Sequence, residues 1–361
     1  MESECANRYK RSETTRSKLM IDLLLLNPCE ATGHAPPSGL QLGSYLHSRR
    51  KLKYEAIYFP LGYPIKVACN STRVLEAADE SWGCFDAAFD CEPLEILVEV
   101  RSVAGMDEAL PPAPVHRQNG SLLLDIADSD NFYIVDLKSG RSMARVTPVA
   151  AAFSRYLRYF FLEGMAMSMI ATLRAVAIHA ACVRVGGKGV LLCGDSGAGK
   201  STLAYAGSRA GWAYVSDDAT YVPIDRQDRL AVGNCTQIRF RPTAAKLFPE
   251  LAGRVITPRA AGKPSVEIRT AEWPEITTAN ATRVDHVVFL NRQSADSQQL
   301  LRLNPASVQP WFKQHLISTP EIRPAQEAAL ARLLDARVFE LRYHDLDWAI
   351  DCIQELAQKG N

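Results

Sequence analysis

The segment GVLLCGDSGAGKST, residues 189 to 202, constrains the fold of this chain more than any other. It matches the pattern G-x-x-x-x-G-K-[ST] through Gly194, Gly199, Lys200 and Ser201. An apolar run typical of a buried strand precedes the glycines, and the helical pattern KSTLAYAGSRAG follows them. The motif and its context predict a strand, a phosphate-binding loop and a helix, and therefore a domain of the α/β class. The alternative is a glycine-rich turn that holds no ligand.

The residue types in this loop suit a nucleoside triphosphate with Mg²⁺. Glycines let backbone N–H groups curl around a β-phosphate, and the positive end of the following helix adds to the attraction. Lys200 supplies a cation for phosphate oxygens, and Ser201 offers a hydroxyl to Mg²⁺, which prefers oxygen ligands. We therefore expect ATP and Mg²⁺ as cofactors. The residues expected to contact the nucleotide are Gly194, Asp195, Ser196, Gly197, Ala198, Gly199, Lys200, Ser201 and Thr202.

Two adjacent carboxylates follow the next predicted strand, WAYVS at 212–216. In a right-handed strand–helix–strand unit both strands run in the same direction, so their carboxyl ends lie at one edge of the sheet. Asp217 and Asp218 are therefore expected beside the phosphates. Because neighbouring strand residues project to opposite faces, we expect one carboxylate to face Mg²⁺ or its waters and the other the reacting oxygen. The alternative is that the pair caps a turn, a common use of aspartate.

A histidine is expected at the same edge. The strands HAACVRV and GVLLC flank Gly186-Gly187-Lys188, which is typical of a hairpin turn. Counting across this turn from Gly187 places His179 opposite Asp195, at the mouth of the loop. A lone histidine is more often structural, but its convergence with a lysine and two carboxylates favours a catalytic role.

Length, charge and cysteine usage limit the class of protein. The chain has 361 residues, enough for two domains, and its 41 Lys plus Arg nearly balance its 40 Asp plus Glu. A net charge of +1 gives no basic surface for nucleic acid or an anionic membrane. The nine cysteines are scattered without a C-x-x-C pair, which indicates reduced thiols in the cytoplasm.

Neither apolar segment of the chain is predicted to target or span a membrane. The run LMIDLLLLN near the N-terminus imitates a secretion signal, but Asp22 interrupts it and no convincing cleavage site follows. The run GMAMSMIAT at 164–172 is too short to cross a bilayer.

The chain is expected to have three parts. Residues 1–50 are polar and punctuated by Gly and Pro, so we expect a mostly flexible arm. Residues 51–147 are rich in strand patterns with one helix near TRVLEAADESW, which predicts a small α+β domain. The boundary is expected at Thr147-Pro148, because a threonine cap followed by proline suits the start of a helix running from 148 to about 174.

Residues 148–361 show strands alternating with helices, which predicts a three-layer α/β domain. Helices are expected at about 199–210, 325–336 and 347–358. The predicted strands are IHAACVRV, GVLLC, WAYVS, TYVPI, QIRFR, SVEIR, DHVVFLN and RVFELRY.

The order of these motifs resembles that of a known family. His179, fifteen residues before the Gly194 of GDSGAGKS, and then Asp217-Asp218 resemble the catalytic domain of HPr kinase/phosphorylase over about residues 178–222. That P-loop serine kinase fold is related to ATP-dependent phosphoenolpyruvate carboxykinase. The resemblance implies a P-loop three-layer mixed sheet of this type. It also implies that Asp217 is the base toward an acceptor serine, that His179 assists it, and that Asp218 lies near the metal.

The resemblance weakens further along the chain. The segments RFRPTAAKLFPEL and AAGKPSVEIRT stand where the family carries its acceptor-binding and phosphorolysis residues. Neither HPr as substrate nor the reverse phosphorylase activity is therefore implied. The whole chain looks more like HPr-kinase-related proteins that accompany peptide-modifying systems such as those of lasso peptides, in which a precursor peptide is phosphorylated.

These observations predict an ATP- and Mg²⁺-dependent kinase that phosphorylates a serine of a protein or peptide. The predicted catalytic residues are Asp217, His179 and Lys200, and the predicted metal ligands are Ser201 and Asp218. Three further cations, Arg239, Arg241 and Lys263, are candidates to hold the transferred phosphate or an acidic acceptor, or are simply solvated charges.

Two other functions fit the loop. One is a P-loop ATPase or nucleotide-dependent switch, although the chain has no LSGGQ-type signature and no apolar strand ending in Asp-Glu. The other is a module that holds nucleotide without turnover. The sequence leaves the oligomeric state open, and a homo-oligomer is among the options.

Overall fold

The computed structural model describes residues 52–102, 109–258, 264–292, 297–313, 316 and 318–359. The chain divides into two compact units, which meet in sequence between Arg174 and Ala175. The predicted N-terminal arm, residues 1–50, lies outside the described residues.

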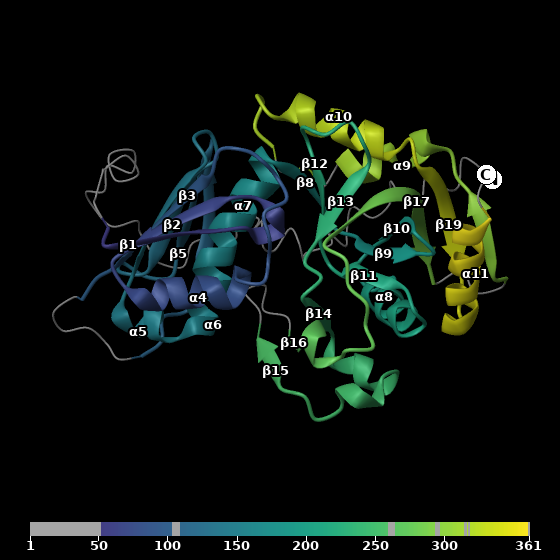
Figure 1. The fold of residues 1–361 in the computed structure, drawn as a ribbon, viewed down its shortest axis with the longest axis horizontal. Helices are drawn as coiled ribbons and strands as arrows, with labels where there is room; N and C mark the ends of the chain where they lie inside the picture. The colour runs from purple at the N-terminus through teal and green to yellow at the C-terminus, as the bar shows by residue number, and fades with distance from the viewer. Residues whose placement is uncertain are drawn as a thin grey trace. The chain divides into compact units, whose positions relative to one another are not determined.

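The N-terminal unit is a seven-stranded sheet with helices packed against it (Figure 1). The strand order is β1-β2-β3-β7-β6-β5-β4. The strands are β1 Tyr54–Tyr58, β2 Ile65–Cys69, β3 Leu94–Val100, β4 Val115–Asn119, β5 Leu122–Ile126, β6 Phe132–Asp136 and β7 Arg141–Val146. The predicted helix is present as α4, Thr72–Trp82.

The segment predicted as one long helix is broken and belongs to the N-terminal unit. It comprises α5 Pro148–Ala152, α6 Ser154–Tyr156, the π-helical η3 Leu157–Leu162 and α7 Glu163–Leu173. The predicted threonine cap is confirmed, because the Thr147 hydroxyl accepts a hydrogen bond from the Ala150 N–H at 3.2 Å. Phe153 then leaves helical geometry (φ −89°, ψ 83°), which interrupts the helix.

Packing explains why the boundary falls after Arg174 and not at Thr147-Pro148, where the sequence predicted it. The Phe161 ring packs edge-on against Tyr133 of β6, with the ring centroids 5.8 Å apart. Arg158 Nε donates to the Ser81 hydroxyl of α4 at 2.7 Å. The apolar face of the helical segment is therefore buried against the preceding sheet and α4, which the local sequence pattern does not reveal.

The C-terminal unit is built on a nine-stranded mixed sheet and a small three-stranded sheet. The strands are β8 Ala175–Ile178, β9 Ala181–Val185, β10 Lys188–Cys193, β11 Ala213–Ser216, β12 Thr220–Pro223, β13 Leu230–Gly233, β14 Gln237–Phe240, β15 Ile256–Pro258, β16 Pro264–Arg269, β17 Ala281–Asn291, β18 Gln299–Arg302 and β19 Arg337–Arg342. The α-helices of this unit, within the described residues, are α8 Lys200–Arg209, α9 Pro305–Lys313, α10 Arg323–Leu333 and α11 Leu346–Gln358.

Every strand predicted for this unit is present, and the structure adds elements that the sequence patterns did not reveal. The predicted strand IHAACVRV is divided into β8 and β9, which pair with different partners. Strands β13, β15 and β18 and helix α9 were not predicted. All three of these strands are only three or four residues long, too short for a periodic pattern to be recognised.

The main sheet has a parallel centre. Its path is β11-β9-β10-β17-β13-β12-β8, and β19 joins the C-terminal half of β17 with β18 beside it. Strands β10, β17 and β19 are parallel neighbours, whereas β9 is antiparallel to both β10 and β11. The strands β10, β11, β17 and β19 therefore end at the same edge of the sheet, where ligands of open α/β sheets bind.

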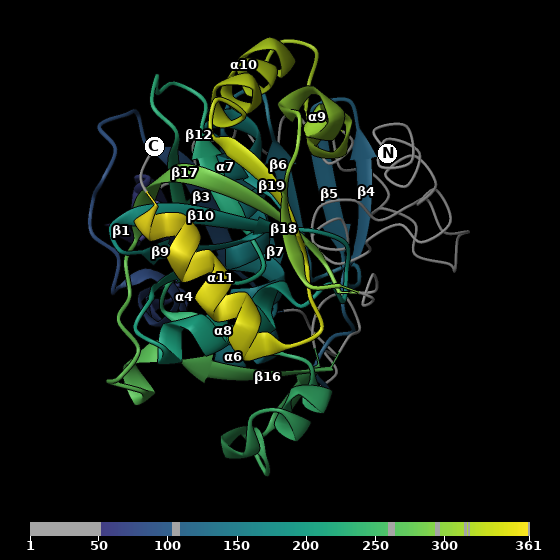
Figure 2. The same cartoon turned by 90° about the vertical axis from the view of Figure 1, so that its right-hand side faces the viewer.

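Two hydrophobic cores cover the two faces of this sheet, so the unit has three layers (Figure 2). On one face, Leu192 of β10 packs with residues of α8 and α11. On the other, Leu191 packs with residues of α9 and α10. This alternation along β10 is the period of two expected for a strand buried on both faces. The three-layer α/β arrangement predicted from the sequence is confirmed at this level.

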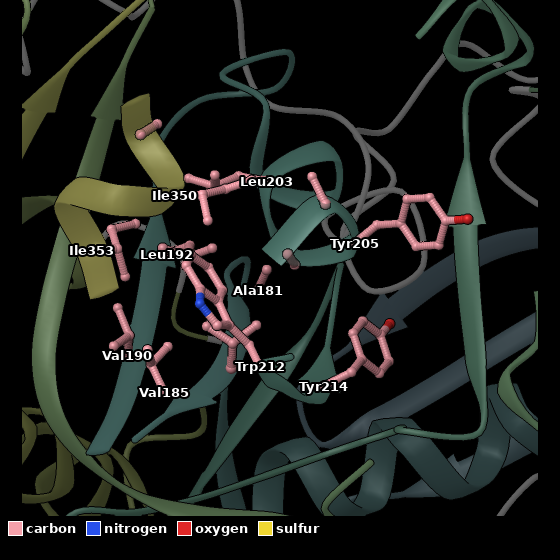
Figure 3. Packing of buried hydrophobic residues seen from close by; sticks show 14 of the residues in the cluster. Ala181, Val185, Val190, Leu192, Leu203, Tyr205, Trp212, Tyr214, Ile350 and Ile353 are labelled. Carbon is pink, nitrogen blue, oxygen red and sulfur yellow. The ribbon is translucent and has the colours of Figure 1, made fainter. Parts of the chain in front are cut away.

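The first of these cores fixes the helix that follows the glycine-rich loop. Leu203 of α8, Ile350 of α11 and Trp212 lie together in this core (Figure 3). The Trp212 ring packs so closely on Gly207 of α8 that a Cβ there would overlap it. Close packing of this kind holds α8, and with it the end of the loop, at a fixed distance from the sheet.

None of the described helices is both long and apolar enough to cross a membrane. The segment at 164–172 forms part of α7, which has eleven residues.

A buried histidine in the central strand predicts how stability depends on pH. His286 of β17 is 0% exposed, and neither ring nitrogen has a hydrogen-bond partner within the described part of the chain. Burial, and then the charge of Arg337, lower the pKa of His286 to about 4. Between that value and its ordinary pKa of 6.5 the unfolded chain binds a proton that the folded chain does not.

We therefore expect this histidine's contribution to stability to be complete above pH 6.5 and to be lost as the pH falls toward 4. The free energy of unfolding of the wild type should drop by about 2 kcal/mol more than that of His286→Leu between pH 7 and pH 5. Urea unfolding of both proteins at the two pH values measures this difference, because the other titrating groups contribute equally. The same pH dependence in both proteins would contradict the expectation.

Candidate functional site

The glycine-rich loop connects β10 to α8 at the carboxyl edge of the sheet. β10 ends at Cys193 and α8 begins at Lys200. Gly194, Gly197 and Gly199 all have positive φ angles, of 140°, 93° and 100°. L-residues with a side chain rarely adopt this conformation, so the glycines of the motif are required by the path of the backbone.

Tyr343 connects the glycine loop to the neighbouring strands. This residue follows β19, is buried, and donates a hydrogen bond from its hydroxyl to the Ala198 carbonyl oxygen at 3.2 Å. A Cβ at Gly199 would lie 2.6 Å from the same hydroxyl, and a Cβ at Gly194 would lie 3.2 Å from the carbonyl oxygen of Leu290 in β17. The loop therefore packs against the ends of β17 and β19 so closely that no side chain fits between them.

Lys200 places a cation inside the loop. Its Nζ donates to the carbonyl oxygens of Gly194 at 2.7 Å and Asp195 at 3.2 Å. Burial lowers the pKa of Lys200 to about 8, and the negative charge of Asp218 acts in the opposite direction. A buried ammonium surrounded by backbone carbonyls is costly unless an anion accompanies it. The loop's shape and this lysine therefore suit the phosphates of a nucleotide.

The two adjacent aspartates follow β11, at the same edge, and have different surroundings. Ser201 Oγ donates to the backbone carbonyl oxygen of Asp217 at 3.3 Å, which connects the start of α8 to this turn. The Asp217 residue is 5% exposed, and its carboxylate accepts a hydrogen bond from the Arg239 N–H at 2.8 Å. Burial, and then this carboxylate, raise the pKa of Tyr214 well above its usual value.

Asp218 is the more accessible of the pair and lies beside the histidine. Its side chain is 22% exposed, and its Oδ1 is 3.5 Å from His179 Nδ1. The same ring nitrogen lies 3.1 Å from the Asp218 carbonyl oxygen. The structure thus pairs His179 with Asp218, whereas the family resemblance implied that His179 assists Asp217.

The position of His179 differs by one residue from the prediction. Ala181 of β9 pairs with Leu192 of β10, so continuing this register places His179 opposite Gly194 and not Asp195. The reason is that Lys188 belongs to β10, and the turn contains only Gly186 and Gly187. His179 itself lies between β8 and β9, at the point where the chain passes from one strand partner to another.

The three additional candidate cations differ in their surroundings. Arg241 Nη2 donates to the Ser196 hydroxyl of the loop at 2.8 Å, and Arg241 is exposed. Arg239 Nε instead lies 3.3 Å from Glu267, so a carboxylate of the small sheet already accompanies its guanidinium. Lys263 lies outside the described residues.

Two side chains at this edge carry oxygen ligands of the kind that Mg²⁺ uses. Nowhere in the described ranges do three or more His, Cys, Asp or Glu side chains gather in a group that could hold a metal ion. Mg²⁺ needs no such group, because one or two protein oxygens, phosphates and waters complete its coordination. The Ser201 hydroxyl and the Asp218 carboxylate are oxygen ligands of this kind.

Some residues of this edge were not found by sequence reasoning. Tyr343 and Asn291 stand at or just after the ends of β19 and β17, both parallel to β10. The rule that placed the aspartates at the loop, the shared edge of parallel strands, applies equally to them. The sequence does not reveal their position, because the order of β10, β17 and β19 in the sheet is not visible in it.

Comparison with known proteins gives only a distant similarity. No protein-family model matches the sequence, and no curated protein matches it. Among solved structures, the chain is similar to the Hpr(Ser) kinase/phosphatase from Coxiella burnetii, with 14% identity, covering 51% of this chain and 99% of that one, at a TM-score of 0.30. Such a distant similarity transfers no function, which must be argued from the residues of this chain.

The contact between Gly199 and Tyr343 predicts a graded effect of alanine in the loop. Gly199→Ala should weaken binding of ATP·Mg²⁺ by at least about tenfold, because the new Cβ meets the Tyr343 hydroxyl as well as adopting a strained φ. Gly197→Ala is the matched control: its φ is also positive, but nothing lies within 4 Å of its Cβ. Gly197→Ala should therefore weaken the binding of ATP·Mg²⁺ less than Gly199→Ala does.

Adding Tyr343→Phe to Gly199→Ala removes the obstructing hydroxyl, so the double variant should recover part of the lost affinity. Calorimetric titration with ATP·Mg²⁺ measures all four proteins, and circular dichroism checks that each is folded. Equal losses for the two alanine variants, or no recovery in the double variant, would show that the close contact does not shape the loop.

Proposed function

We propose that this protein is an ATP- and Mg²⁺-dependent kinase that transfers the γ-phosphate to a serine hydroxyl of a protein or peptide. The observation that carries the proposal is the convergence of three chain segments at one edge of the sheet. The glycine loop with Lys200 suits the phosphates, and Asp218, which pairs with His179, is close enough to Lys200 for its charge to act on the lysine pKa. A P-loop that only bound nucleotide would not need a carboxylate and an imidazole in that place.

The residues of the loop would bind and neutralise the triphosphate. Backbone N–H groups of the curled loop and the N-terminal end of α8 face an anion favourably. Lys200 contributes a full positive charge, and the exposed Arg241, held at the loop by Ser196, is close enough to join it. Phosphoryl transfer depends mainly on positioning and charge stabilisation, so these groups supply most of what the reaction requires.

Mg²⁺, when bound, would neutralise the charge that develops on the phosphate oxygens. The Ser201 hydroxyl is the protein ligand that would hold it, together with phosphate oxygens and waters. Asp217 is not suited to this role, because its carboxylate is buried and already accepts the Arg239 N–H.

We assign the proton transfer to Asp218 and not to Asp217. A general base has to reach the acceptor hydroxyl, and Asp218 is the more exposed carboxylate. His179 Nδ1, 3.5 Å from Asp218 Oδ1, would orient this carboxylate and stabilise its charge. Asp217 then serves to hold the turn, since its carboxylate joins the end of β11 to the Arg239 backbone in β14.

The two assignments are separated by single substitutions. Asp218→Asn should lower kcat by roughly a thousandfold at saturating Mg²⁺ and leave ATP affinity within a few fold of wild type. Asp217→Asn should mainly lower the thermal unfolding temperature. Transfer of labelled phosphate from ATP to serine-containing peptides and lysate proteins measures kcat, with the exposed Asp228→Asn as the matched control. If Asp217→Asn lost most of its kcat and Asp218→Asn did not, Asp217 and not Asp218 would be the general base.

The same assay tests the remaining alternatives. If Asp218 acts mainly as a metal ligand, its asparagine variant should recover activity when the Mg²⁺ concentration is raised. Release of ADP without an acceptor, together with no labelled protein, would indicate a P-loop ATPase or switch. The Lys200→Ala variant should show neither transfer nor ADP release, because the triphosphate loses its buried cation.

A further inference from the structure

A polar network at the ends of β17 and β19 lies next to the glycine loop and has no part in the chemistry above. Glu340 of β19 is 3% exposed, and its Oε1 accepts a hydrogen bond from Asn291 Nδ2 at 2.6 Å. Its Oε2 accepts from Arg342 Nε at 3.1 Å and Nη2 at 3.0 Å. A buried carboxylate stabilises a fold little better than an apolar residue of the same size, so its presence calls for another reason.

The network fixes the orientation of the Asn291 side chain. An ionised carboxylate can only accept hydrogen bonds, so Asn291 must turn its amide N–H₂ toward Glu340. Arg342 donates two hydrogen bonds to the other carboxylate oxygen of Glu340, which fixes the carboxylate in the position where it accepts from Asn291. The amide oxygen of Asn291 is left as an acceptor, and no residue in the described ranges donates to it. Asn291 is half-buried and therefore within reach of a ligand.

The position of Asn291 relative to the loop is set by direct contacts. Leu290, its neighbour in β17, lies against Gly194 of the loop. The Tyr343 N–H donates to the Asn291 carbonyl oxygen at 3.3 Å, and the hydroxyl of the same tyrosine donates to Ala198. Tyr343 therefore links the backbone of Asn291 to the glycine loop, so Asn291 lies within the length of a nucleoside triphosphate from the loop.

The topology places this network on the side of the loop opposite the catalytic pair. Going outward from β10, strands β9 and β11 lead to His179 and Asp218, and strands β17 and β19 lead to Asn291 and Glu340. A nucleotide has its base at one end and its γ-phosphate at the other. With the γ-phosphate toward Asp218, the base extends toward β17 and β19.

We propose that Asn291, oriented by Glu340 and Arg342, forms a base-recognition subsite that selects adenine over guanine. Its amide oxygen accepts a hydrogen bond from the exocyclic amino group of adenine, whereas the carbonyl oxygen of guanine at the same ring position would face it with two acceptors and no proton. Asn291 is the specificity-determining residue, and Glu340 and Arg342 are positioning residues. The inference rests on the proposed function for the direction of the bound nucleotide.

Calorimetric titration of the full chain with ATP·Mg²⁺ and with GTP·Mg²⁺ tests the subsite without measuring catalysis. Wild type should bind ATP on the order of tenfold more tightly than GTP, the size expected when one buried hydrogen bond is exchanged for two opposed acceptors. Asn291→Ala should bring the ratio of the two dissociation constants close to one, mainly through weaker ATP binding. Gln299→Ala is the matched control, because this exposed amide lies opposite Arg342 on β18 and should leave the ratio unchanged.

Glu340→Gln gives a second, more specific readout. A glutamine can donate to the Asn291 amide oxygen, which frees the asparagine to turn its N–H₂ outward. The amide then suits the carbonyl oxygen of guanine, so the preference for ATP should disappear or reverse. If Glu340 has only a structural role, Glu340→Gln should instead weaken the binding of ATP and of GTP by the same factor. Thermal unfolding of each variant verifies that it is folded before its ratio is compared.

The outcomes distinguish this inference from the kinase proposal. Equal affinity of the wild type for ATP and GTP, or an unchanged ratio in Asn291→Ala, overturns the base-recognition subsite and leaves the kinase proposal standing. Selective ATP binding without any phosphate transfer overturns the kinase proposal alone. If neither nucleotide binds, both fail.

Discussion

The fit of the glycine loop between β10, α8 and the ends of β17 and β19 is the constraint on which the rest of this unit depends. The loop backbone takes positive φ angles at three glycines, and the Tyr343 hydroxyl fills the space where a side chain at Gly199 would lie. This path turns Lys200 inward, where it is buried and donates to two loop carbonyls. The core residues of α8 and the close contact of Trp212 with Gly207 keep α8, and therefore Lys200 at its start, in place. The inward position of the Lys200 cation is therefore a consequence of packing as much as of the motif.

The order of strands around β10 places two different groups of polar residues on the two sides of the glycine loop. On the side of β9 and β11 lie His179 and Asp218, an imidazole and a carboxylate 3.5 Å apart. On the side of β17 and β19 lies a polar network that can hold one amide in one orientation. The first group is suited to chemistry because it is partly accessible, and the second to recognition because its buried carboxylate restricts movement. The two adjacent aspartates differ in the same way. Asp218 is partly accessible, whereas Asp217 is buried and accepts a hydrogen bond from the backbone of β14.

Much of the fold could be predicted because its elements are strongly patterned. The apolar runs of the central strands, the helix over Thr72–Trp82 and the threonine cap at Thr147 all depend on residues close together in the chain. The predictions that failed concerned longer distances. The segment after Thr147 belongs to the N-terminal unit because Phe161 and Arg158 find partners there. The histidine register shifted by one residue because Lys188 is part of the strand and not of the turn.

The sequence by itself determined the strand, loop and helix around Gly194–Ser201, since glycine, lysine and serine at this spacing encode a local backbone path and its charge. It also determined that Asp217 and Asp218 follow the next strand of that unit, because a short connection leaves little choice of direction. Only the tertiary structure decided which aspartate meets His179 and which is buried, and that Asn291, Glu340 and Tyr343 adjoin the loop. The physical reason is that side-chain environments depend on strand order and register, which are set by contacts between residues up to 145 positions apart in the chain.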